Sequence, residues 1–469
     1  MYKVKIGDEV IYAEGGEILS DVLLKHKKPV EHPCGGRGTC KKCKVNVNGK
    51  EELSCRYVIN SDIEVSLSGT ENIISETGAD TTGSITKNLC FALDIGTTTI
   101  ALALVSLDEG KIVKVITGTN PQRAFGADIM TRISYCRQNS QNELNRVVIA
   151  EINRLIGEFG IERIDTMYVA GNVTMLHLFF NADCSSIGVA PYTPVFLESK
   201  SADAEDIGII GVGKVISLPS VSSFVGADIV AGMNYTGFPS DGKYNLLVDL
   251  GTNAEVVLFS ENSGLATAAA AGPCFEGANI SFGMSATSGA VYSFSLKQNR
   301  EKDVKTISDV PAKGICGTGL IDIIAELVKA NIIDETGYME DETYIISDNV
   351  TLSQGDVRQF QLAKSAVYSA ILSLIKTENI AFEQIENMYI SGGFSAKINI
   401  ESAVTCGLLP AALASKTVPI NNSSLLGTVK FALEQNDLSV YTRNTEYVDL
   451  SSSRYFSDLF IENMMFETL

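Results

Sequence analysis

Short stretches of the chain alternate apolar and polar residues, the pattern of β-strands with one buried face. Two of them, 2–6 and 10–13, flank the dipeptide Gly7-Asp8 and predict a β-hairpin. Apolar residues then recur at helical spacing in EILSDVLLKHK (17–27), and KVNVNGKEEL (44–53) predicts a second hairpin. The first seventy residues therefore predict a small α+β domain.

Two longer segments repeat one order of strands and turns. Residues 91–115 and 245–269 each read as an apolar strand, an Asp-x-Gly-Thr turn, a second strand, a turn and a third strand. A later pair, 164–172 and 385–393, each reads as an apolar strand that ends at glycine. Amphipathic helices are predicted before these strands, at 141–158 and 362–377. The pattern predicts an α/β fold built from two similar halves.

Composition limits the classes of protein that remain. The 469 residues are 45% hydrophobic and 20% charged, which favours large cores over disorder. The net charge of −19 disfavours binding to nucleic acid, whose phosphates would be repelled. No run of 18 apolar residues predicts a membrane span, and the N-terminus lacks the apolar region of a secretory signal. We therefore expect a cytoplasmic protein whose ten cysteines are thiols or metal ligands.

Charge and cysteine content set the predicted domain boundaries. Residues 1–70 hold 11 basic and 10 acidic side chains and four of the cysteines, whereas the remainder holds 26 basic and 46 acidic side chains. Residues 71–88 are rich in Thr, Ser and Gly without a hydrophobic period, which is typical of a linker. The predicted domains are 1–70, the linker 71–88, and two halves of a larger domain at 89–240 and 241–469.

The four N-terminal cysteines have the spacing C-x5-C-x2-C-x11-C: Cys34, Cys40, Cys43 and Cys55. Glycines between the first three let backbone N–H groups approach the sulfurs of an iron–sulfur cluster, and four thiolates satisfy a [2Fe–2S] centre. A zinc site with four cysteines is the alternative, but it usually has two C-x2-C pairs and only one is present. We predict a [2Fe–2S] cluster.

The two Asp-x-Gly-Thr turns offer groups that bind a nucleotide. Backbone N–H groups and hydroxyls of such turns suit phosphate oxygens, and the leading carboxylates, Asp94 and Asp249, can hold a hydrated Mg²⁺. Two turns that face each other across a cleft would hold a triphosphate from both sides. A glycine pair after the strand 387–391 leaves room for a flat base. The predicted phosphate and base contacts are Gly96, Thr97, Thr98, Thr99, Gly251, Thr252, Asn253, Gly392 and Gly393. For a single motif, a hairpin-turn Asp is the competing interpretation.

Both parts resemble known families. Residues 1–70 resemble the β-grasp [2Fe–2S] ferredoxins, although the cysteine spacing departs by one residue from the plant-type C-x4-C-x2-C pattern. The rest resembles the ATPase superfamily of actin, sugar kinases and heat-shock chaperones, with Asp94–Thr99 and Asp249–Asn253 as phosphate motifs. In this resemblance Ser391-Gly392-Gly393-Phe394 is the adenosine motif. Gly317, Thr318 and Gly319 resemble a loop beside the ribose, for which the N-terminus of a glycine-rich helix is the alternative.

The combination of the two parts resembles the reductive activators of corrinoid proteins. Segments that carry the resemblance include PCGGRGTC (33–40), GNVTMLHLF (171–179), GPCFEGANISFGM (272–284) and SGGFSAKIN (391–399). It implies ATP-driven reduction of cob(II)alamin to cob(I)alamin, with an electron from the [2Fe–2S] cluster. It also implies a corrinoid protein and a low-potential electron donor as partners, and a homodimer through the ATPase part. Some members have an extra region where this chain has only the linker.

Individual roles are less defined by the pattern. Asp94 and Asp249 are expected to position Mg²⁺, and Asn172 or Glu255 to position water. Asp128 and Asp228 occur in a repeated Gly-Ala-Asp-Ile, which helix capping also explains. His177 is interpreted as a core histidine, and six further cysteines as small buried residues: Cys90, Cys136, Cys184, Cys274, Cys316 and Cys406.

Three other functions are compatible with parts of the pattern. An activator of 2-hydroxyacyl-CoA dehydratases would place a [4Fe–4S] cluster between two ATPase subunits, which the Cys34–Cys55 set argues against. A metabolite kinase leaves the ferredoxin part unexplained. The non-enzyme alternative is an electron-carrying or redox-sensing module with a nucleotide-gated scaffold.

Overall fold

The computed structural model describes residues 1–7, 9–26, 28, 30, 38, 43–66, 88–297, 300–393 and 395–466. By its internal contacts the chain divides into two compact units, Met1–Ser217 and Leu218–Leu469. Among the described residues, no helix combines the length and the apolar character that crossing a bilayer requires.

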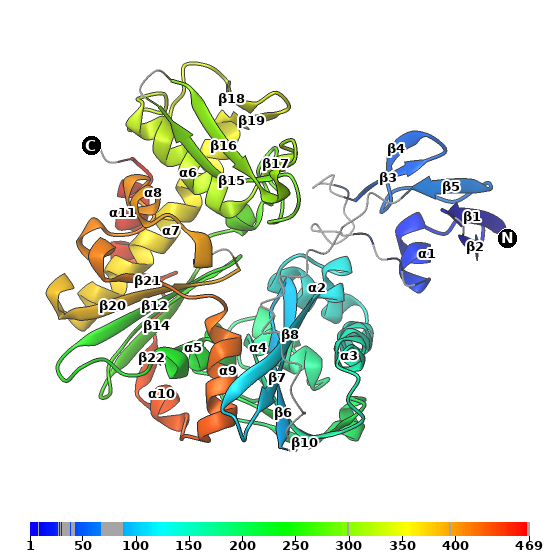
Figure 1. Cartoon of the computed structure of the whole chain (residues 1–469), viewed down its shortest axis with the longest axis horizontal. Helices are drawn as coiled ribbons and strands as arrows, with labels where there is room; N and C mark the ends of the chain where they lie inside the picture. The colour runs from blue at the N-terminus through cyan, green and yellow to red at the C-terminus, as the bar shows by residue number, and fades with distance from the viewer. Residues whose placement is uncertain are drawn as a thin grey trace. The chain divides into compact units, whose positions relative to one another are not determined.

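A five-stranded mixed sheet and one helix form the N-terminal part of the first unit (Figure 1). The strand order is β2-β1-β5-β3-β4, with β1 parallel to β5 and every other pair antiparallel. The elements are β1 (Tyr2–Ile6), β2 (Glu9–Ala13), α1 (Leu19–Lys25), β3 (Lys44–Val47), β4 (Lys50–Leu53) and β5 (Ile63–Ser66). Both predicted hairpins and the predicted helix are confirmed. At the second hairpin Asn48 and Gly49 have φ of 51° and 82°, as a tight two-residue turn requires.

The first unit also contains a six-stranded sheet of order β10-β11-β9-β6-β7-β8. Its strands are β6 (Leu89–Ile95), β7 (Thr99–Ser106), β8 (Lys111–Thr119), β9 (Ile164–Gly171), β10 (Ser201–Asp203) and β11 (Val212–Ser217). Its helices are η1 (Pro121–Ala124), α2 (Ile129–Gln138), α3 (Gln141–Gly157), α4 (Val173–Phe179), η2 (Ser185–Gly188) and η3 (Ala204–Ile207). The helix predicted at 141–158 is confirmed as α3.

The second unit has a larger six-stranded sheet of order β21-β20-β12-β13-β14-β22 and two small ones, β16-β15-β17 and β18-β19. The strands are β12 (Tyr244–Leu250), β13 (Ala254–Phe259), β14 (Gly264–Ala269), β15 (Ala290–Leu296), β16 (Lys302–Thr306), β17 (Gly314–Ile315), β18 (Thr343–Ser347), β19 (Val350–Ser353), β20 (Ile385–Ser391), β21 (Thr417–Pro419) and β22 (Thr445–Tyr447). The α-helices are α5 (Ala227–Thr236), α6 (Gly317–Lys329), α7 (Gln354–Glu378), α8 (Ile400–Thr405), α9 (Ser423–Glu434), α10 (Ser439–Arg443) and α11 (Arg454–Glu462). The 3₁₀ turns are η4 (Pro273–Glu276), η5 (Ile307–Asp309), η6 (Phe382–Gln384), η7 (Ser395–Lys397) and η8 (Ala411–Lys416).

The two large sheets repeat one topology, which confirms the predicted duplication. In the first, β6, β7 and β8 form an antiparallel meander, and β9 lies parallel to β6 on its other side. In the second, β12, β13 and β14 form the same meander, and β20 lies parallel to β12. In register, Asp94 faces Ala170 and Asp249 faces Ser391, so both acidic residues occupy equivalent positions at the ends of central strands.

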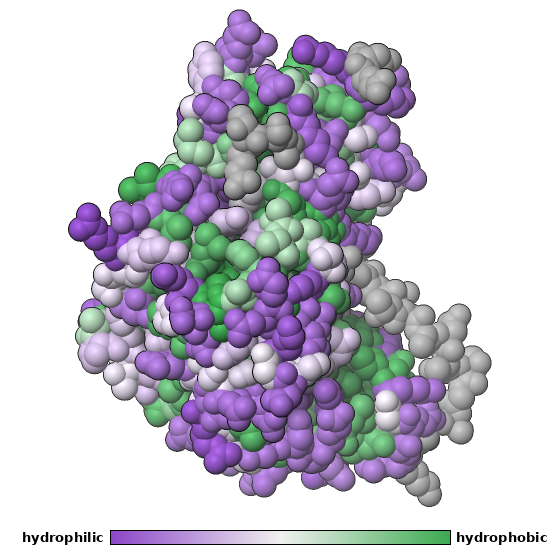
Figure 2. Space-filling view, turned by 90° about the vertical axis from the view of Figure 1, so that its left-hand side faces the viewer, coloured by the Kyte–Doolittle hydropathy of each residue, from purple (hydrophilic) through white to green (hydrophobic). Residues whose placement is uncertain are grey.

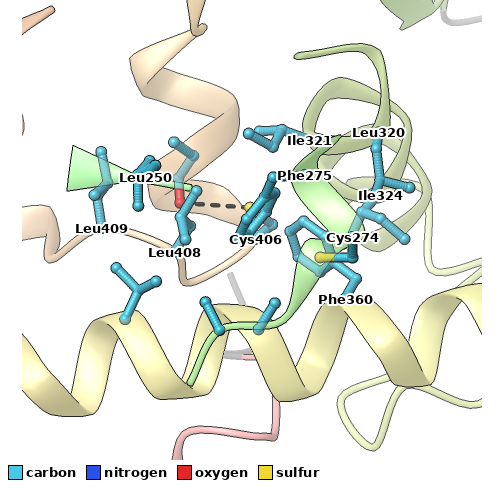
Figure 3. Packing of buried hydrophobic residues seen from close by; sticks show 14 of the residues in the cluster. Leu250, Cys274, Phe275, Leu320, Ile321, Ile324, Phe360, Cys406, Leu408 and Leu409 are labelled. Carbon is cyan, nitrogen blue, oxygen red and sulfur yellow. Dashed lines mark hydrogen bonds between the residues drawn. The ribbon is translucent and has the colours of Figure 1, made fainter. Parts of the chain in front are cut away.

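Apolar side chains from α6, α7, α8 and the large sheet form the core of the second unit. Figure 3 shows Phe275, Cys406 and Leu408 within this cluster. Burial raises the pKa of the thiols of Cys274 and Cys406 to about 12, so both behave as small apolar side chains at neutral pH. On the face drawn in Figure 2, by contrast, hydrophilic residues cover much of the surface.

Helix α7 is longer than the predicted segment 362–377. It begins at Gln354 with a capping box, in which Ser353 Oγ accepts from Asp356 N–H and Asp356 accepts from Ser353 N–H. Two buried polar residues of α7 hold the C-terminal segment: Gln361 donates to the carbonyl of Met464 (2.7 Å) and Lys364 to that of Met465 (2.5 Å). These two side chains thus tie α7 to residues Met464 and Met465.

Candidate nucleotide and iron–sulfur sites

In the first unit, the turn between β6 and β7 carries the first predicted phosphate motif. Gly96 N–H donates to the carbonyl of Thr99 (2.9 Å), which closes the turn. A Cβ at Gly96 would lie 2.7 Å from that same oxygen, so only glycine fits the close approach. Asp94 lies one residue before the end of β6 and is partly buried.

Three successive carbonyls of this turn point to buried donors. Asn120 Nδ2 donates to the carbonyl of Gly96 (2.8 Å), Arg132 Nη2 to that of Thr97 (2.5 Å) and Asn120 N–H to that of Thr98 (2.9 Å). A trans peptide holds its C=O and N–H on opposite sides. The N–H groups that follow these carbonyls therefore point away from Asn120 and Arg132.

Asn172, which the sequence predicted to position water, lies beside the same turn. It caps α4, where its Oδ1 accepts from Met175 N–H (3.0 Å), and its Nδ2 donates to Thr97 Oγ1 (3.2 Å). The hydrogen bond from Met175 N–H fixes the side-chain amide of Asn172 in an orientation that contacts Thr97. Asn120 and Arg132 were not predicted. The Asn-Pro-Gln at 120–122 was the available signal for a cap, whereas nothing in the sequence marks Arg132 as buried.

Two side chains of this unit have the structural roles that the sequence analysis favoured or left open. Asp128 caps α2, with Oδ1 accepting from Thr131 N–H (2.7 Å). His177 is fully buried and stacked on Phe196, its Nε2 accepts from Val195 N–H (3.0 Å), and its Nδ1 lies 2.7 Å from the carbonyl of Val173. Because Nε2 is an acceptor, the ring is neutral and Nδ1–H is the donor, so His177 is confirmed as a core histidine.

In the second unit, the turn between β12 and β13 carries the second predicted phosphate motif. Gly251 N–H donates to the carbonyl of Asn253 (3.0 Å). Thr252 Oγ1 donates to Glu276 Oε2 (3.0 Å), which ties the turn to η4. Asp249 lies directly across from Glu255 in the β12–β13 pairing. Glu276 was absent from the predicted residues.

Three acidic side chains, Asp228, Asp249 and Glu276, surround Glu255 near this second turn. Burial raises the pKa of Glu255 well above its usual range, and the neighbouring charges of Asp228, Asp249 and Glu276 raise it further. Asp228 Oδ1 also accepts a hydrogen bond from Ile229 N–H (2.9 Å), one of the N–H groups in the first turn of α5. A divalent cation would offset these negative charges. Within the described ranges no three His, Cys, Asp or Glu side chains are arranged as a ready metal site. Mg²⁺ does not require one, since it usually takes one or two carboxylates together with water and phosphate.

The glycine pair after β20 lies against the end of β12. Gly392 has φ of +116°, and a Cβ there would lie 2.2 Å from the carbonyl oxygen of Leu250. A Cβ at Gly393 would meet nothing within 4 Å, so this position borders open space. Ser391 Oγ forms a hydrogen bond with Ser423 Oγ (2.7 Å). Phe394, the last residue of the predicted adenosine motif, lies outside the described residues.

Gly317, Thr318 and Gly319 form the buried first turn of α6. A Cβ at Gly319 would lie 2.1 Å from the carbonyl oxygen of Val291, so this glycine lets α6 pack against β15. This is the helix N-terminus that the sequence analysis gave as the alternative to a ribose loop. A ligand-binding role for the three residues stays a prediction.

Two of the four predicted cluster ligands lie in the described part of the chain, and they are adjacent. The Sγ atoms of Cys43 and Cys55 are 3.2 Å apart, and both side chains are buried. This distance is far longer than the roughly 2.05 Å of a disulfide bond, so no disulfide joins the two cysteines. Cys34 and Cys40 lie outside the described residues.

Gly38, between these last two cysteines, approaches the side chain of Arg56. It has φ of +74°, and a Cβ there would lie 2.7 Å from Arg56 Nε. The side chain of Arg56, the residue that follows Cys55, therefore lies against the backbone of Gly38.

Comparison with known protein families identifies the larger part of the chain. A family model described as the RACo middle region matches residues 89–241, and one described as the C-terminal domain of RACo, the ASKHA domain, matches residues 243–469. The chain belongs to the RACo family, the reductive activators of corrinoid proteins. Its duplicated sheets are thus an ATPase fold of the ASKHA type.

Two relatives, each from a different organism, align with the chain. The corrinoid activation enzyme RamQ of Eubacterium limosum is 25% identical over 583 aligned positions, covering 98% of this chain and 98% of RamQ. The reductase named for the Co(II) methylated amine-specific corrinoid protein, from Methanosarcina barkeri, is 27% identical over 391 positions, covering 74% of this chain and 70% of that protein. A solved structure titled reductive activator for corrinoid, iron-sulfur protein is 26% identical and superposes with a TM-score of 0.73, covering 99% of this chain and 98% of the other.

Proposed function

We propose that this protein uses Mg-ATP to drive the reduction of a corrinoid protein's cob(II)alamin to cob(I)alamin, with an electron passed through a [2Fe–2S] cluster. The reaction adds one electron to the cobalt. A low-potential donor must then reduce the cluster again. The relatives named for corrinoid activation and Co(II) corrinoid reduction support this substrate.

The observation that carries the electron-transfer part is the adjacency of Cys43 and Cys55. Two buried cysteines whose Sγ atoms lie 3.2 Å apart, without a disulfide bond, are placed closely enough to bind one metal centre. We propose Cys34 and Cys40 as the other two ligands, since they complete a set of four thiolates. The order β2-β1-β5-β3-β4 with its single helix fits the proposed ferredoxin-like domain. When bound, the cluster supplies one electron at low potential.

The nucleotide part rests on the two equivalent turns. In the first unit, we propose that the N–H groups at Thr97 and Thr98, with the hydroxyl groups of Thr97, Thr98 and Thr99, bind phosphate oxygens. Asn172 holds the Thr97 hydroxyl in place (3.2 Å) and orients water near it. In the second unit, we propose that Asp249 holds hydrated Mg²⁺ and that Gly251, Thr252 and Asn253 contact phosphate. The open space at Gly393 leaves room for the adenine ring.

We propose that ATP binding and electron transfer are coupled in this protein. Plant-type [2Fe–2S] centres have reduction potentials of about −400 mV. Reduction of Co(II) that retains a water ligand requires a more negative potential than this. Binding energy from ATP can stabilise a conformation of the activator that changes the cobalt's ligation in the partner. We propose that the protein is a cytoplasmic homodimer and that its acidic ATPase part docks a basic patch of the corrinoid protein.

Partner-stimulated ATP hydrolysis tests this proposal against the alternatives. Mg-ATP hydrolysis should rise when a corrinoid protein in the Co(II) state is added, and should not rise with the Co(I) state. A metabolite kinase would instead respond to a small acceptor molecule. Hydrolysis that ignores the corrinoid protein in both states would contradict the proposed function.

A further inference from the structure

Arg132 is a completely buried cation on α2, at 0% exposure. Its guanidinium donates from all three nitrogens: Nε to the carbonyl of Gly126 (2.9 Å), Nη1 to Gln122 Oε1 (3.2 Å) and Nη2 to the carbonyl of Thr97 (2.5 Å). A charge buried in a protein is costly unless it is hydrogen-bonded or paired. These contacts fix the guanidinium in one position behind the turn Gly96–Thr98.

The partners of Arg132 are themselves fixed, so the turn rests on a connected polar frame. Gln122 Nε2 donates to the carbonyl of Leu144 (3.0 Å), which ties the frame to α3. Asn120 Oδ1 accepts from Gln122 N–H (3.0 Å), and Asn120 binds the carbonyls on either side of the one that Arg132 holds. The frame is entirely within the first unit.

We propose that Arg132 is a positioning residue for phosphate recognition, an inference that rests on the proposed binding of Mg-ATP. By holding the Thr97 carbonyl inward, it turns the Thr98 N–H outward to the position where an anion binds. Its positive charge also lies directly behind this turn. In the low dielectric of the interior that charge favours an anion on the other side. Arg132 itself touches no phosphate; it acts through the peptide that it holds.

The test compares Arg132→Lys with Arg137→Lys. Lysine keeps the charge but lacks the planar fork that reaches three acceptors. Arg137 lies on the same helix with an exposed side chain and serves as the matched control. Calorimetry would give the Kd of Mg-ATP and of adenosine for wild type and each variant, with thermal unfolding as the measure of folding. The adenosine measurement separates phosphate recognition from a general loss of structure.

We expect Arg132→Lys to raise the Kd of Mg-ATP about tenfold, equivalent to 1.4 kcal/mol, and to leave that of adenosine unchanged. Arg137→Lys should change neither. Equal losses for Mg-ATP and adenosine, or an unchanged Kd for Mg-ATP in folded Arg132→Lys, would overturn the assignment. Wild type that binds no Mg-ATP would overturn the proposed function as well, so the two failures are distinguishable.

Should Arg132→Lys not fold, Met175→Leu provides a milder test. Met175 Sδ lies 3.1 Å from Arg132 Nη1, and leucine conserves volume while it removes this acceptor. We expect a Kd of Mg-ATP raised about threefold, again without an effect on adenosine. An unchanged ratio between the two ligands in this variant would overturn the proposal.

Discussion

The Sγ atoms of Cys43 and Cys55 lie 3.2 Å apart, although eleven residues separate them in the sequence. The hairpin β3–β4 brings them together: Ser54 N–H donates to the carbonyl of Cys43 (2.9 Å), immediately after β4 ends at Leu53. The short gap between the third and fourth cysteines is therefore the length of one tight hairpin.

Replacing Cys55 by serine should abolish the cluster and spare nucleotide binding. Serine supplies a poor ligand for iron, while the ASKHA domain is a separate part of the chain. A [2Fe–2S] cluster bound by four thiolates gives about two iron and two sulfide per chain. Wild-type protein prepared anaerobically should have this content, and Cys55→Ser should have much less. Cys90→Ala, at a buried cysteine of β6, is the control that should keep its iron. Stoichiometric zinc in wild type would refute the assignment.

Gly38→Ala should reduce iron content through two effects. The left-handed φ of +74° costs an L-residue roughly 1–2 kcal/mol, and the new methyl group would meet Arg56 Nε at 2.7 Å. Gly49→Ala carries a similar strain, at φ of +82°, with nothing within 4 Å, and separates the strain from the collision. We expect iron loss in Gly38→Ala, near-normal iron in Gly49→Ala, and partial recovery when Arg56→Ala is added to Gly38→Ala. Equal iron content in both glycine variants would show that the Arg56 contact has no effect on the cluster.

Asp249→Ala should lower Mg-ATP hydrolysis by at least about tenfold, or 1.4 kcal/mol in the activation free energy. The reason is the loss of the carboxylate proposed to hold Mg²⁺. Asp241→Ala removes an exposed acid outside the turn and is the control. Steady-state hydrolysis over a range of Mg²⁺ concentrations would check the result. Persistence of hydrolysis in both Asp94→Ala and Asp249→Ala would refute the metal assignment.

His177 should make the protein less stable in mild acid. Burial lowers the pKa of its ring from 6.5, so between this value and the lower folded pKa the unfolded chain binds more protons than the folded one. The His177 contribution to stability is thus constant above about pH 6.5 and falls as the pH is lowered through that value. Urea unfolding at pH 7.5 and pH 5.5 should show a larger loss for wild type than for His177→Gln. The same loss in both would contradict this role.

The strand pattern and its duplication could be predicted because both depend on local residue order. The apolar runs that become β6 and β12, each followed by Asp-x-Gly-Thr, need no tertiary information. The N-terminal hairpins follow from Gly7-Asp8 and Asn48-Gly49 in the same way. The prediction missed the first eight residues of α7, QGDVRQFQ, which are mostly polar. Gln361, the last of them, is buried because it contacts the distant residue Met464.

The residues of the two turns could be predicted from the sequence, whereas the buried residues that hydrogen-bond to those turns could not. Asp94, Thr97 and Asp249 stand in recognisable motifs, whereas Asn120 and Arg132 support the first turn from 24 and 35 residues away. An arginine in a helix is ordinarily a surface residue. Arg132 is buried only because the fold brings the carbonyls of Gly126 and Thr97 to it. Glu276 likewise meets Thr252 only after η4 is placed beside the turn.

The central claim is that this chain couples an electron to ATP for the reduction of cobalt. The most direct measurement is the absorbance of Co(I) that appears when the protein, a low-potential donor and a corrinoid protein in the Co(II) state are mixed with and without Mg-ATP. We predict that Co(I) forms with wild type and Mg-ATP, and fails to form without Mg-ATP, with Cys55→Ser or with Asp249→Ala. Equal rates of Co(I) formation with and without Mg-ATP would contradict the claim.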